Sequence, residues 1–316
     1  MHWRSIFDPE INMARLRLVP AAVLLGTSAL VLSGCASQPS TSPQNIAEQE
    51  FRDADLDVIF ATEFPVTSKA DALQRAQTSL EEGEVDKGLF FYVKALNYDP
   101  DDAGLLYRIG RIHDHGGDAE MATRAYTLAL RSNPDLVPAL ESRGLLLLAH
   151  KEDIRAEQDL ERAVALDATA WRAQNGLGLI EDRKGNHEKA IALYSAALAV
   201  EPTVAEVLNN RGYSRMLAGH LFAAEADLRQ SAALGYRKAW INLGALLARS
   251  GQYGQAVDAY NEVLDEPESL NKAAEIAMEN RDQDVAQNLL ERAIKQSPVY
   301  FPDAEQNLAQ LTADKY

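Results

Sequence analysis

The sequence predicts an all-α protein, a right-handed α-solenoid of about seven helix pairs closed by a C-terminal capping helix. The first observation behind this prediction is a glycine that recurs at intervals of 34 residues and finally of 32, at Gly110, Gly144, Gly178, Gly212 and Gly244. The second is a large apolar residue that keeps the same register, at Tyr92, Tyr126, Leu160, Tyr194, Leu228, Tyr260 and Leu290. Self-similarity at a fixed period of this length indicates stacked units of supersecondary structure.

The segment 171–202 shows what one unit contains. Apolar residues fall at helical spacings on both sides of a turn at Lys184-Gly185-Asn186, and Pro202 ends the second helix. A glycine inside a helix costs about 1 kcal/mol relative to alanine, so a recurring one needs a compensating contact. We expect that the glycine lets the two helices of a unit approach closely, with the Tyr or Leu of the second helix beside it.

The first 34 residues predict a lipoprotein signal peptide. Two arginines form a basic start, and the apolar stretch at 18–32 has 15 residues, fewer than the roughly 20 that span a bilayer. The motif Leu-Ser-Gly-Cys at 32–35 resembles the cleavage box of bacterial lipoproteins, which implies that Cys35 is acylated and becomes the mature N-terminus. Met13 is a candidate translation start, because the acidic residues before it suit a signal peptide poorly.

The segment that follows predicts a tether between the lipid and the repeats. Residues 35–45 combine the acylated cysteine with a flexible linker rich in Ser, Gln, Pro and Thr, and 46–68 predict a short helix and then a break. Several acyl chains on one residue anchor a protein stably, whereas a single chain is marginal. Ala36, by resemblance to enterobacterial lipoproteins, implies a lipid-anchored protein of the outer membrane that faces the periplasm.

The repeats are expected to cover residues 69–300 without a linker. Their expected bounds are 69–102, 103–136, 137–170, 171–204, 205–236, 237–266 and 267–300. The first and last carry Ala76 and Ala274 in place of the glycine, as suits end units that need not pack on both sides. Residues 301–316 predict a capping helix and tail, in which Leu308 and Leu311 cover the last repeat.

The 34-residue period, the two helices per unit and the recurring Gly, Ala and Tyr positions resemble the tetratricopeptide repeat family. In that family the first helix of each pair lines a groove that binds partners. The register of this chain therefore gives candidates for partner binding, with Leu145 and Leu179 also facing the groove. The principal candidates are Tyr107, Arg111, Arg172, Asn175, Asn209, Tyr213 and Met216.

Two kinds of side chain motivate these candidates. Asn175 and Asn209 hold equivalent positions in successive repeats, and their amides can both donate to and accept from an extended peptide backbone. Tyr107, Tyr213 and Met216 offer apolar anchors. Asparagine also occurs in such repeats without any ligand, so a purely structural role for the two amides stays open.

Composition argues against several classes of partner. The formal net charge is −16, and the sequence contains no basic run, which opposes nucleic acid binding. The acidic surface is expected either to serve solubility alone or to prefer basic partner segments. No cofactor or small-molecule substrate is expected, because no phosphate-binding loop, nucleophile elbow or zinc-protease motif occurs.

The sequence also predicts no metal site and no catalytic residue. His113-Asp114-His115 is the stretch that comes nearest to metal ligation, but two histidines two positions apart on a helix point away from each other. The helical carboxylates stand beside arginines, as solvated i,i+4 pairs do. We therefore expect a binding protein rather than an enzyme.

A finer resemblance concerns the function. The run Leu208-Asn209-Asn210-Arg211-Gly212-Tyr213 and the ending at 292–308, together with the lipoprotein box, resemble the TadD-type lipoproteins of tight-adherence (Flp) pilus assembly. This resemblance implies a non-enzymatic scaffold that holds the secretin or another component of that secretion system. Arg211 and Arg215 depart from it, because such repeats more often have apolar or aromatic residues there.

Two alternatives belong to other functional settings. One is a general envelope scaffold that docks enzymes of the cell wall, and the other is a type IV pilus pilotin-like protein. Both would use the same repeats to hold a protein segment, so the repeat pattern does not distinguish them.

Overall fold

The structure is a computed structural model, and it describes residues 65–313. The predicted signal peptide, the acylated Cys35, the linker and most of the 46–68 segment lie outside these residues. The described chain divides between Leu105 and Leu106 into two compact units, and each unit is described by itself. All of the regular secondary structure described is helical, which confirms the predicted all-α class.

The first unit contains the hairpin of α3 (Lys69–Glu81) and α4 (Val85–Leu96). Here the glycine lies on the second helix, because a Cβ on Gly88 would be 2.6 Å from Cγ of Leu80 on the first. Ala76, at the position that glycine holds in later repeats, is fully buried. Register alone identified Ala76 and missed Gly88, since only the contact shows which helix contributes the small residue.

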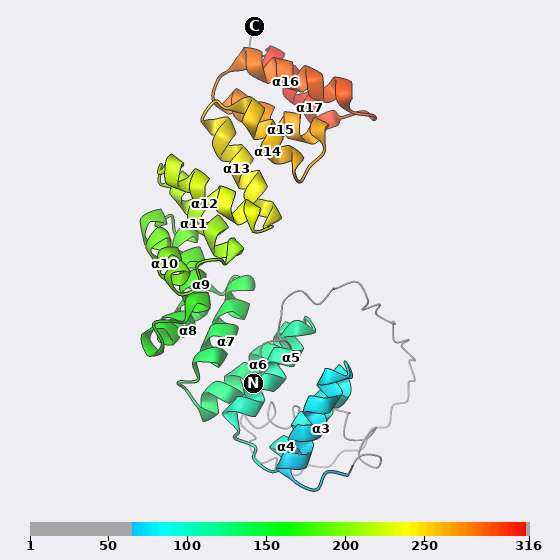
Figure 1. Cartoon of the computed structure of the whole chain (residues 1–316), viewed down its shortest axis with the longest axis vertical. Coiled ribbons are helices and arrows are strands. Elements are labelled where there is room, and N and C mark those ends of the chain that lie inside the picture. The colour runs from blue at the N-terminus through cyan, green and yellow to red at the C-terminus, as the bar shows by residue number, and fades with distance from the viewer. Residues whose placement is uncertain (1–64, 314–316) are drawn as a thin grey trace, which may run out of the picture. The chain divides into compact units, whose positions relative to one another are not determined.

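The second unit is a series of helical hairpins that follow one another along the chain and end in a single helix (Figure 1). The helices that open a hairpin are α5 (Ala103–His115), α7 (Val137–Ala149), α9 (Trp171–Arg183), α11 (Ala205–Leu217), α13 (Arg237–Arg249) and α15 (Glu266–Glu279). The helices that close one are α6 (Ala119–Ser132), α8 (Asp153–Leu166), α10 (His187–Val200), α12 (Leu221–Ala233), α14 (Tyr253–Asn261) and α16 (Gln283–Gln296). Each closing helix from α6 to α14 packs against the opening helix of the next hairpin.

The predicted close approach within a hairpin is confirmed. A Cβ built on Gly178 of α9 would lie 2.4 Å from Cε1 of Tyr194 on α10, a distance at which two carbon atoms overlap. Tyr194 is fully buried. The same contact recurs with separations of 2.6, 2.7, 2.8 and 2.6 Å at the pairs Gly110–Tyr126, Gly144–Leu160, Gly212–Leu228 and Gly244–Tyr260.

Two kinds of repeat alternate from α5 to α12. In the first kind the large residue is a tyrosine whose hydroxyl donates to a carboxylate on the opening helix. Tyr126 Oη lies 3.2 Å from Asp114 Oδ2, and Tyr194 Oη lies 2.9 Å from Asp182 Oδ2. Burial, assisted by the neighbouring carboxylates, raises the pKa of both tyrosines, so each remains protonated and can donate.

In the second kind the large residue is a leucine, and an arginine–aspartate pair stands beside it. Arg143 Nε and Nη2 each donate to Asp159 at 2.7 Å, and the same two nitrogens of Arg211 donate to Asp227 at 2.8 Å. Both aspartates are buried. Bidentate pairing provides each buried carboxylate with the charged partner that burial requires.

These arginines also connect neighbouring repeats. Nη1 of Arg143 donates to Thr127 Oγ1 at 3.2 Å, and Nη1 of Arg211 donates to Ser195 Oγ at 3.3 Å, each on the closing helix before. Arg215 adds a second cation to the later aspartate, with Nη1 at 2.7 Å from Oδ2. Arg211 and Arg215 therefore replace apolar residues because a buried carboxylate faces them.

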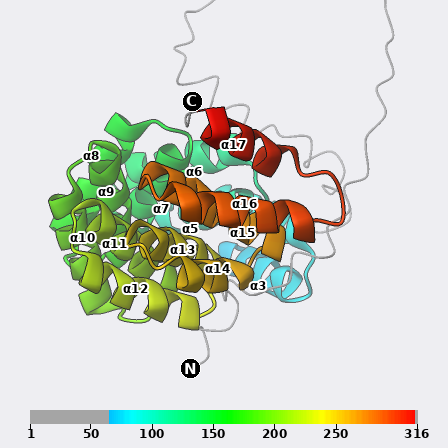
Figure 2. The ribbon, with the colours of Figure 1, turned by 90° about the horizontal axis from the view of Figure 1, so that it is seen from above.

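The last helix, α17 (Pro302–Ala313), caps the unit as predicted. It lies against α16 and α15, and Figure 2 shows it beside α16. Ala304 and Leu311 are buried, and Leu308 is partly buried against the same cluster, while Asp303 and Gln310 are exposed. Within residues 65–313, no helix is both long and apolar enough to cross a bilayer.

The alternation predicts a specific double-mutant result at Arg143 and Asp159. The next repeat holds Leu177 and Leu193 at these two positions. We expect Asp159→Leu alone to destabilise the protein by about 3–5 kcal/mol, because it leaves Arg143 without its counter-ion. Combining it with Arg143→Leu should restore stability to within about 1 kcal/mol of wild type or better.

The measurement is urea unfolding of wild type, both single variants and the double variant. A double variant whose loss equals the sum of the two single losses would contradict the pairing, because independent residues add.

Candidate protein-binding surface

The predicted binding residues lie on the opening helices α5, α7, α9 and α11. Leu145, Leu179 and Tyr213 hold equivalent positions on α7, α9 and α11, and we call them the apolar row. Leu145 and Leu179 are partly exposed, and 40% of Tyr213 is exposed. Leu145 lies against the neighbouring helix, since a Cβ on Gly176 of α9 would be 3.0 Å from its Cδ2. The apolar row thus gives three successive repeats the same kind of accessible side chain.

Tyr107 and Arg111 form a pair on α5. Both are partly exposed, and Arg111 Nη1 donates to Tyr107 Oη at 3.1 Å. The guanidinium carbon lies 6.0 Å from the centre of the Tyr107 ring, at the outer limit of a cation–π contact. The ring in turn lies 5.8 Å from that of Tyr126, which fixes its place on the hairpin.

Asn175 and Asn209 are buried and hydrogen-bonded to other amides. Asn210 Nδ2 donates to Asn175 Oδ1 at 3.1 Å, and Asn242 Nδ2 donates to Asn209 Oδ1 at 2.8 Å. Asn209 Nδ2 lies 3.3 Å from Asn210 Oδ1, which joins the two bonds into one chain from α13 to α9. These contacts favour the structural role that the sequence left open, and binding of a peptide by the two amides stays a prediction.

Met216 is also largely withdrawn from solvent. Only 7% of it is exposed, and it belongs to the hydrophobic cluster that includes Leu228 and Leu243. It stands at the position that Asp182 holds one repeat earlier, where the carboxylate accepts a hydrogen bond from Tyr194. A leucine in place of that tyrosine needs no hydrogen bond, so an apolar residue fits at Met216.

Arg172 lies at the start of α9, near Glu141 of α7. Its guanidinium carbon is 4.4 Å from the centre of the Trp171 ring. Glu141 Oε1 accepts from the Ala173 N–H at 3.2 Å and so caps α9, whose own N-cap residue, Ala170, makes no such bond. Burial raises the pKa of Glu141, although the Ala173 N–H and Arg172 act in the opposite direction. The repeat register predicted Arg172 as a binding residue, but it did not predict that Glu141 caps α9, because this contact joins two different repeats.

The His113-Asp114-His115 stretch does not bring its histidines together. His115 Nδ1 lies 2.7 Å from the carbonyl oxygen of Arg111, while His113 is partly buried beside Asp118. Burial lowers the pKa of His113, with Asp118 opposing that shift. Nowhere in residues 65–313 do three His, Cys, Asp or Glu side chains form a group that could hold a metal ion.

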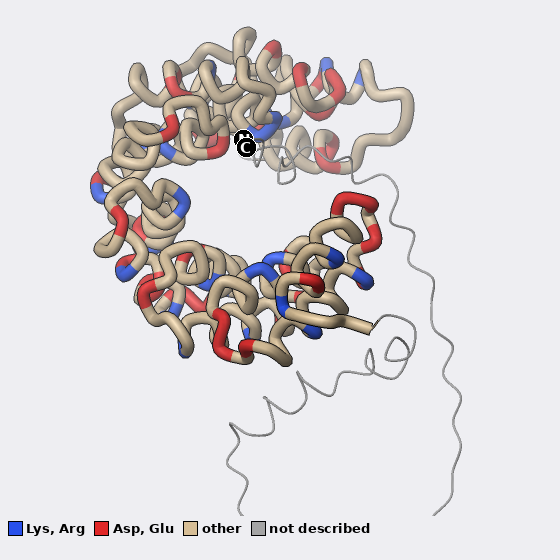
Figure 3. The backbone as a smooth tube through the Cα atoms, turned by 60° about the horizontal axis from the view of Figure 1, so that its bottom comes forward, with Lys and Arg blue, Asp and Glu red and all other residues tan. Residues whose placement is uncertain are grey.

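Acidic and basic positions are interleaved along the described helices. Figure 3 shows Lys and Arg scattered among Asp and Glu, without a continuous basic stripe in the described chain. Many of these charges are paired at the surface, as in Arg162 with Asp135 at 2.6 Å and Arg183 with Asp153 at 2.5 Å. Exposed pairs of this kind contribute little to stability.

Comparison with known proteins identifies the repeats. Sequence profiles of the tetratricopeptide repeat match residues 103–136, 154–203 and 238–266, so these segments are similar to that repeat. The chain is 33% identical over 131 residues to tetratricopeptide repeat protein 7A of Homo sapiens, a match that covers 41% of this chain and 15% of that protein. Matches to the first three curated relatives span only 13% to 36% of those proteins.

Solved structures agree on the fold. A tetratricopeptide repeat protein from Parabacteroides merdae is 15% identical with a TM-score of 0.55, over 77% of this chain and 98% of that chain. PilW, described as a widely conserved type IV pilus biogenesis factor, is 21% identical with a TM-score of 0.52, over 66% of this chain and 98% of that chain. Likeness at such low identity shows the helical-repeat fold alone.

The Glu141 cap predicts a pH-dependent effect of Glu141→Gln, which keeps an accepting oxygen and removes the charge. Because the folded pKa is raised, the contribution of Glu141 to stability is complete below its ordinary value of 4.5 and is lost as the pH rises through the folded pKa. We expect the variant and wild type to have the same melting temperature at about pH 4. At pH 7 the variant should melt about 1–3 °C higher than wild type.

Thermal unfolding followed by circular dichroism at both pH values gives the answer. Glu161→Gln, which removes an exposed carboxylate from α8, is the matched control for the change in net charge. A Glu141→Gln variant less stable than wild type at pH 7 would show that the charged form is favoured in the folded protein.

Proposed function

We propose that this chain is a non-enzymatic scaffold that holds a segment of a partner protein across the apolar row. The observation that carries the proposal is the repetition of an accessible apolar side chain, Leu145, Leu179 and Tyr213, at one register on three consecutive opening helices. Apolar side chains at a fixed spacing, set on rigid helices, are the ordinary means by which a repeat protein anchors an extended or helical segment.

Polar groups around the apolar row give the partner an orientation. Arg111 and Arg172 are accessible cations at its edge, and Glu141 lies next to Arg172. The amides of Asn175 and Asn209 are hydrogen-bonded to amides of the next opening helix, which holds these helices in register. Rigid spacing of the row lowers the conformational cost of binding, since little in the scaffold must be ordered first.

The finer proposal concerns the cellular setting. We infer that Cys35 carries a lipid anchor in the outer membrane, that the repeats face the periplasm, and that the partner is the secretin or another component of a Tad/Flp pilus secretion system. The lipoprotein box and the resemblance of 208–219 and 292–308 to TadD-type lipoproteins support this inference. The anchor would raise the effective concentration of the scaffold at the membrane. The fold of PilW shows that a pilus biogenesis factor can be built from such repeats.

The lipid anchor predicts a labelling result for Cys35→Ser. Wild-type protein should incorporate radiolabelled palmitate in cells, and the variant should incorporate none, because it lacks the only thiol of the chain. An immunoblot for equal accumulation is the control. A wild-type protein isolated with an unmodified Cys35 thiol would overturn the anchor and the localisation together.

The partner is tested by placing a photo-crosslinking amino acid at Tyr213 in intact envelopes. We expect an adduct with the secretin or another pilus-assembly component, identified by mass spectrometry. The same amino acid at Phe222 of α12, which is 89% exposed and outside the apolar row, is the matched control and should give no such adduct.

Other outcomes of this experiment separate the alternatives. Adducts with cell-wall hydrolases or synthases would contradict the pilus proposal and support a general envelope scaffold. Adducts with a type IV pilus secretin would favour the pilotin-like function. Identical adducts at Tyr213 and Phe222 would remove the apolar row from the proposal.

A further inference from the structure

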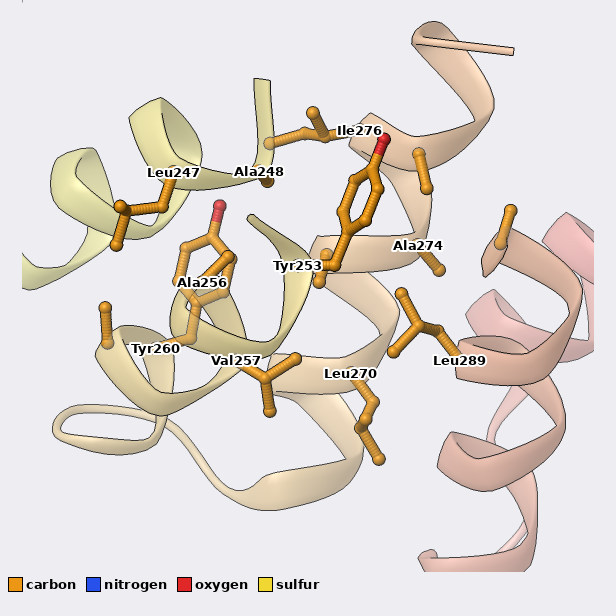
Figure 4. Packing of buried hydrophobic residues seen from close by; sticks show 14 of the residues in the cluster. Leu247, Ala248, Tyr253, Ala256, Val257, Tyr260, Leu270, Ala274, Ile276 and Leu289 are labelled. Carbon is orange, nitrogen blue, oxygen red and sulfur yellow. The ribbon is translucent and has the colours of Figure 1, made fainter. Parts of the chain in front are cut away.

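A pocket of about 550 Å³ lies on the closing-helix side of the second unit, between α14 and α16. Its apolar lining comes from Tyr253 and Val257 on α14 and from Val285 and Leu289 on α16. Val257 and Leu289 are 7% and 5% exposed, so they form its floor, whereas Val285 is 38% exposed at its mouth. Figure 4 shows Val257 and Leu289 on either side of Leu270 of α15. This volume lies within the range of known ligand pockets.

The shortened repeat accounts for the place of the pocket. Helix α14 has nine residues, whereas the closing helices α10 and α16 have 14 each. The chain therefore turns early after Asn261, and Glu266 in the first turn of α15 becomes part of the pocket wall. The period of 32 and then 30 residues in this region thus produces an opening between two closing helices.

The pocket rim carries more acidic than basic side chains. Asp258, Glu266 and Asp284 line it together with one cation, Arg292. None of the three carboxylates forms an ion pair or hydrogen bond through its side chain within residues 65–313. Glu266 and Asp284 lie in first turns, where the helix dipole favours negative charge. Asp258 has no such support, because it lies inside α14, a helix without any lysine or arginine.

Amides complete the rim on both sides. Asn261 of α14 and Asn288 of α16 line the pocket and are exposed, and neither side-chain amide is bonded within the described residues. They differ in this from Asn175 and Asn209, whose side-chain oxygens accept from the amides of Asn210 and Asn242. An amide can donate to and accept from a peptide backbone that lies between the two helices.

We propose that this pocket is a second protein-binding site, which takes a short segment carrying an aliphatic side chain beside a lysine or arginine. The aliphatic group occupies the floor of Val257 and Leu289, the cation pairs with Asp258 at the rim, and Asn261 and Asn288 bind the backbone. The charge complementarity selects a basic segment over an acidic one. The site lies between α14 and α16 with Glu266 of α15 in its wall, and it contains no residue of the apolar row.

The probe is a fluorescein-labelled seven-residue peptide of alternating leucine and lysine, with the leucine–glutamate peptide as its counterpart. Fluorescence anisotropy at about 0.15 M ionic strength screens general attraction to the acidic protein. We expect saturable binding of the lysine peptide to the full chain and at least about tenfold weaker binding of the glutamate peptide.

Gly254→Leu is the most informative variant. A Cβ on Gly254 would have no atom within 4 Å, so a larger side chain there fills the pocket without distorting the hairpin, and it replaces a helical glycine. We expect at least about tenfold weaker probe binding with an unchanged or higher melting temperature.

The charge of the rim is tested by Asp258→Asn, which should weaken probe binding about threefold. The matched control is Glu268→Gln, which removes an exposed carboxylate in the first turn of α15 outside the pocket and should leave binding unchanged.

Three results would overturn the proposal. The first is equal binding to wild type and Gly254→Leu, and the second is equal weakening by Asp258→Asn and Glu268→Gln, which would indicate general charge attraction. The third is a concentration-dependent dimer in sedimentation that Val285→Asp abolishes, which would make the pocket an interface between copies of the chain. Tyr213→Ala should leave probe binding unchanged, because Tyr213 does not line the pocket. The proposal for this pocket and the proposal for the apolar row can therefore be tested independently.

Discussion

The close approach of two helices within each hairpin is the constraint from which the rest of the second unit follows. A glycine on the opening helix leaves just enough space for a tyrosine ring or a leucine on the closing helix, and a single added carbon would overlap that side chain at 2.4 to 2.8 Å. This contact repeats in five successive hairpins. It sets the distance between their helices and thereby the positions at which every other residue meets its neighbour.

The choice between tyrosine and leucine at that contact determines the polar interactions around it. A buried tyrosine hydroxyl needs an acceptor, and Asp114 and Asp182 supply it at the end of the opening helix. A leucine needs none, and in those repeats the residue before the leucine is an aspartate that pairs with Arg143 or Arg211. Both arrangements tie charged groups to defined partners within and between hairpins, which favours one register of stacking over others.

The two sides of the second unit use their polar groups differently. On the opening helices, amides join successive repeats through Asn175, Asn209 and Asn242, and the apolar side chains of Leu145, Leu179 and Tyr213 stay partly exposed. On the closing helices near the C-terminal end, the short α14 leaves an apolar floor with amides and carboxylates that have no partner in the described chain. The two proposed binding sites therefore differ in their chemistry.

The helix pairs, the glycine contacts within them and the capping helix could be predicted from the sequence, because they depend on a short repeat period and on local helical spacing. Packing alone shows that Met216 lies in the core and that Asn175 and Asn209 bind other amides. It also shows that Arg211 and Arg215 pair with Asp227, and that the close-contact glycine of the first hairpin, Gly88, lies on the second helix. Register places a residue on its own helix but does not show which side chain stands across from it. In the polar pairs named here that side chain is 12 to 35 positions away in the sequence, and only packing brings the two together.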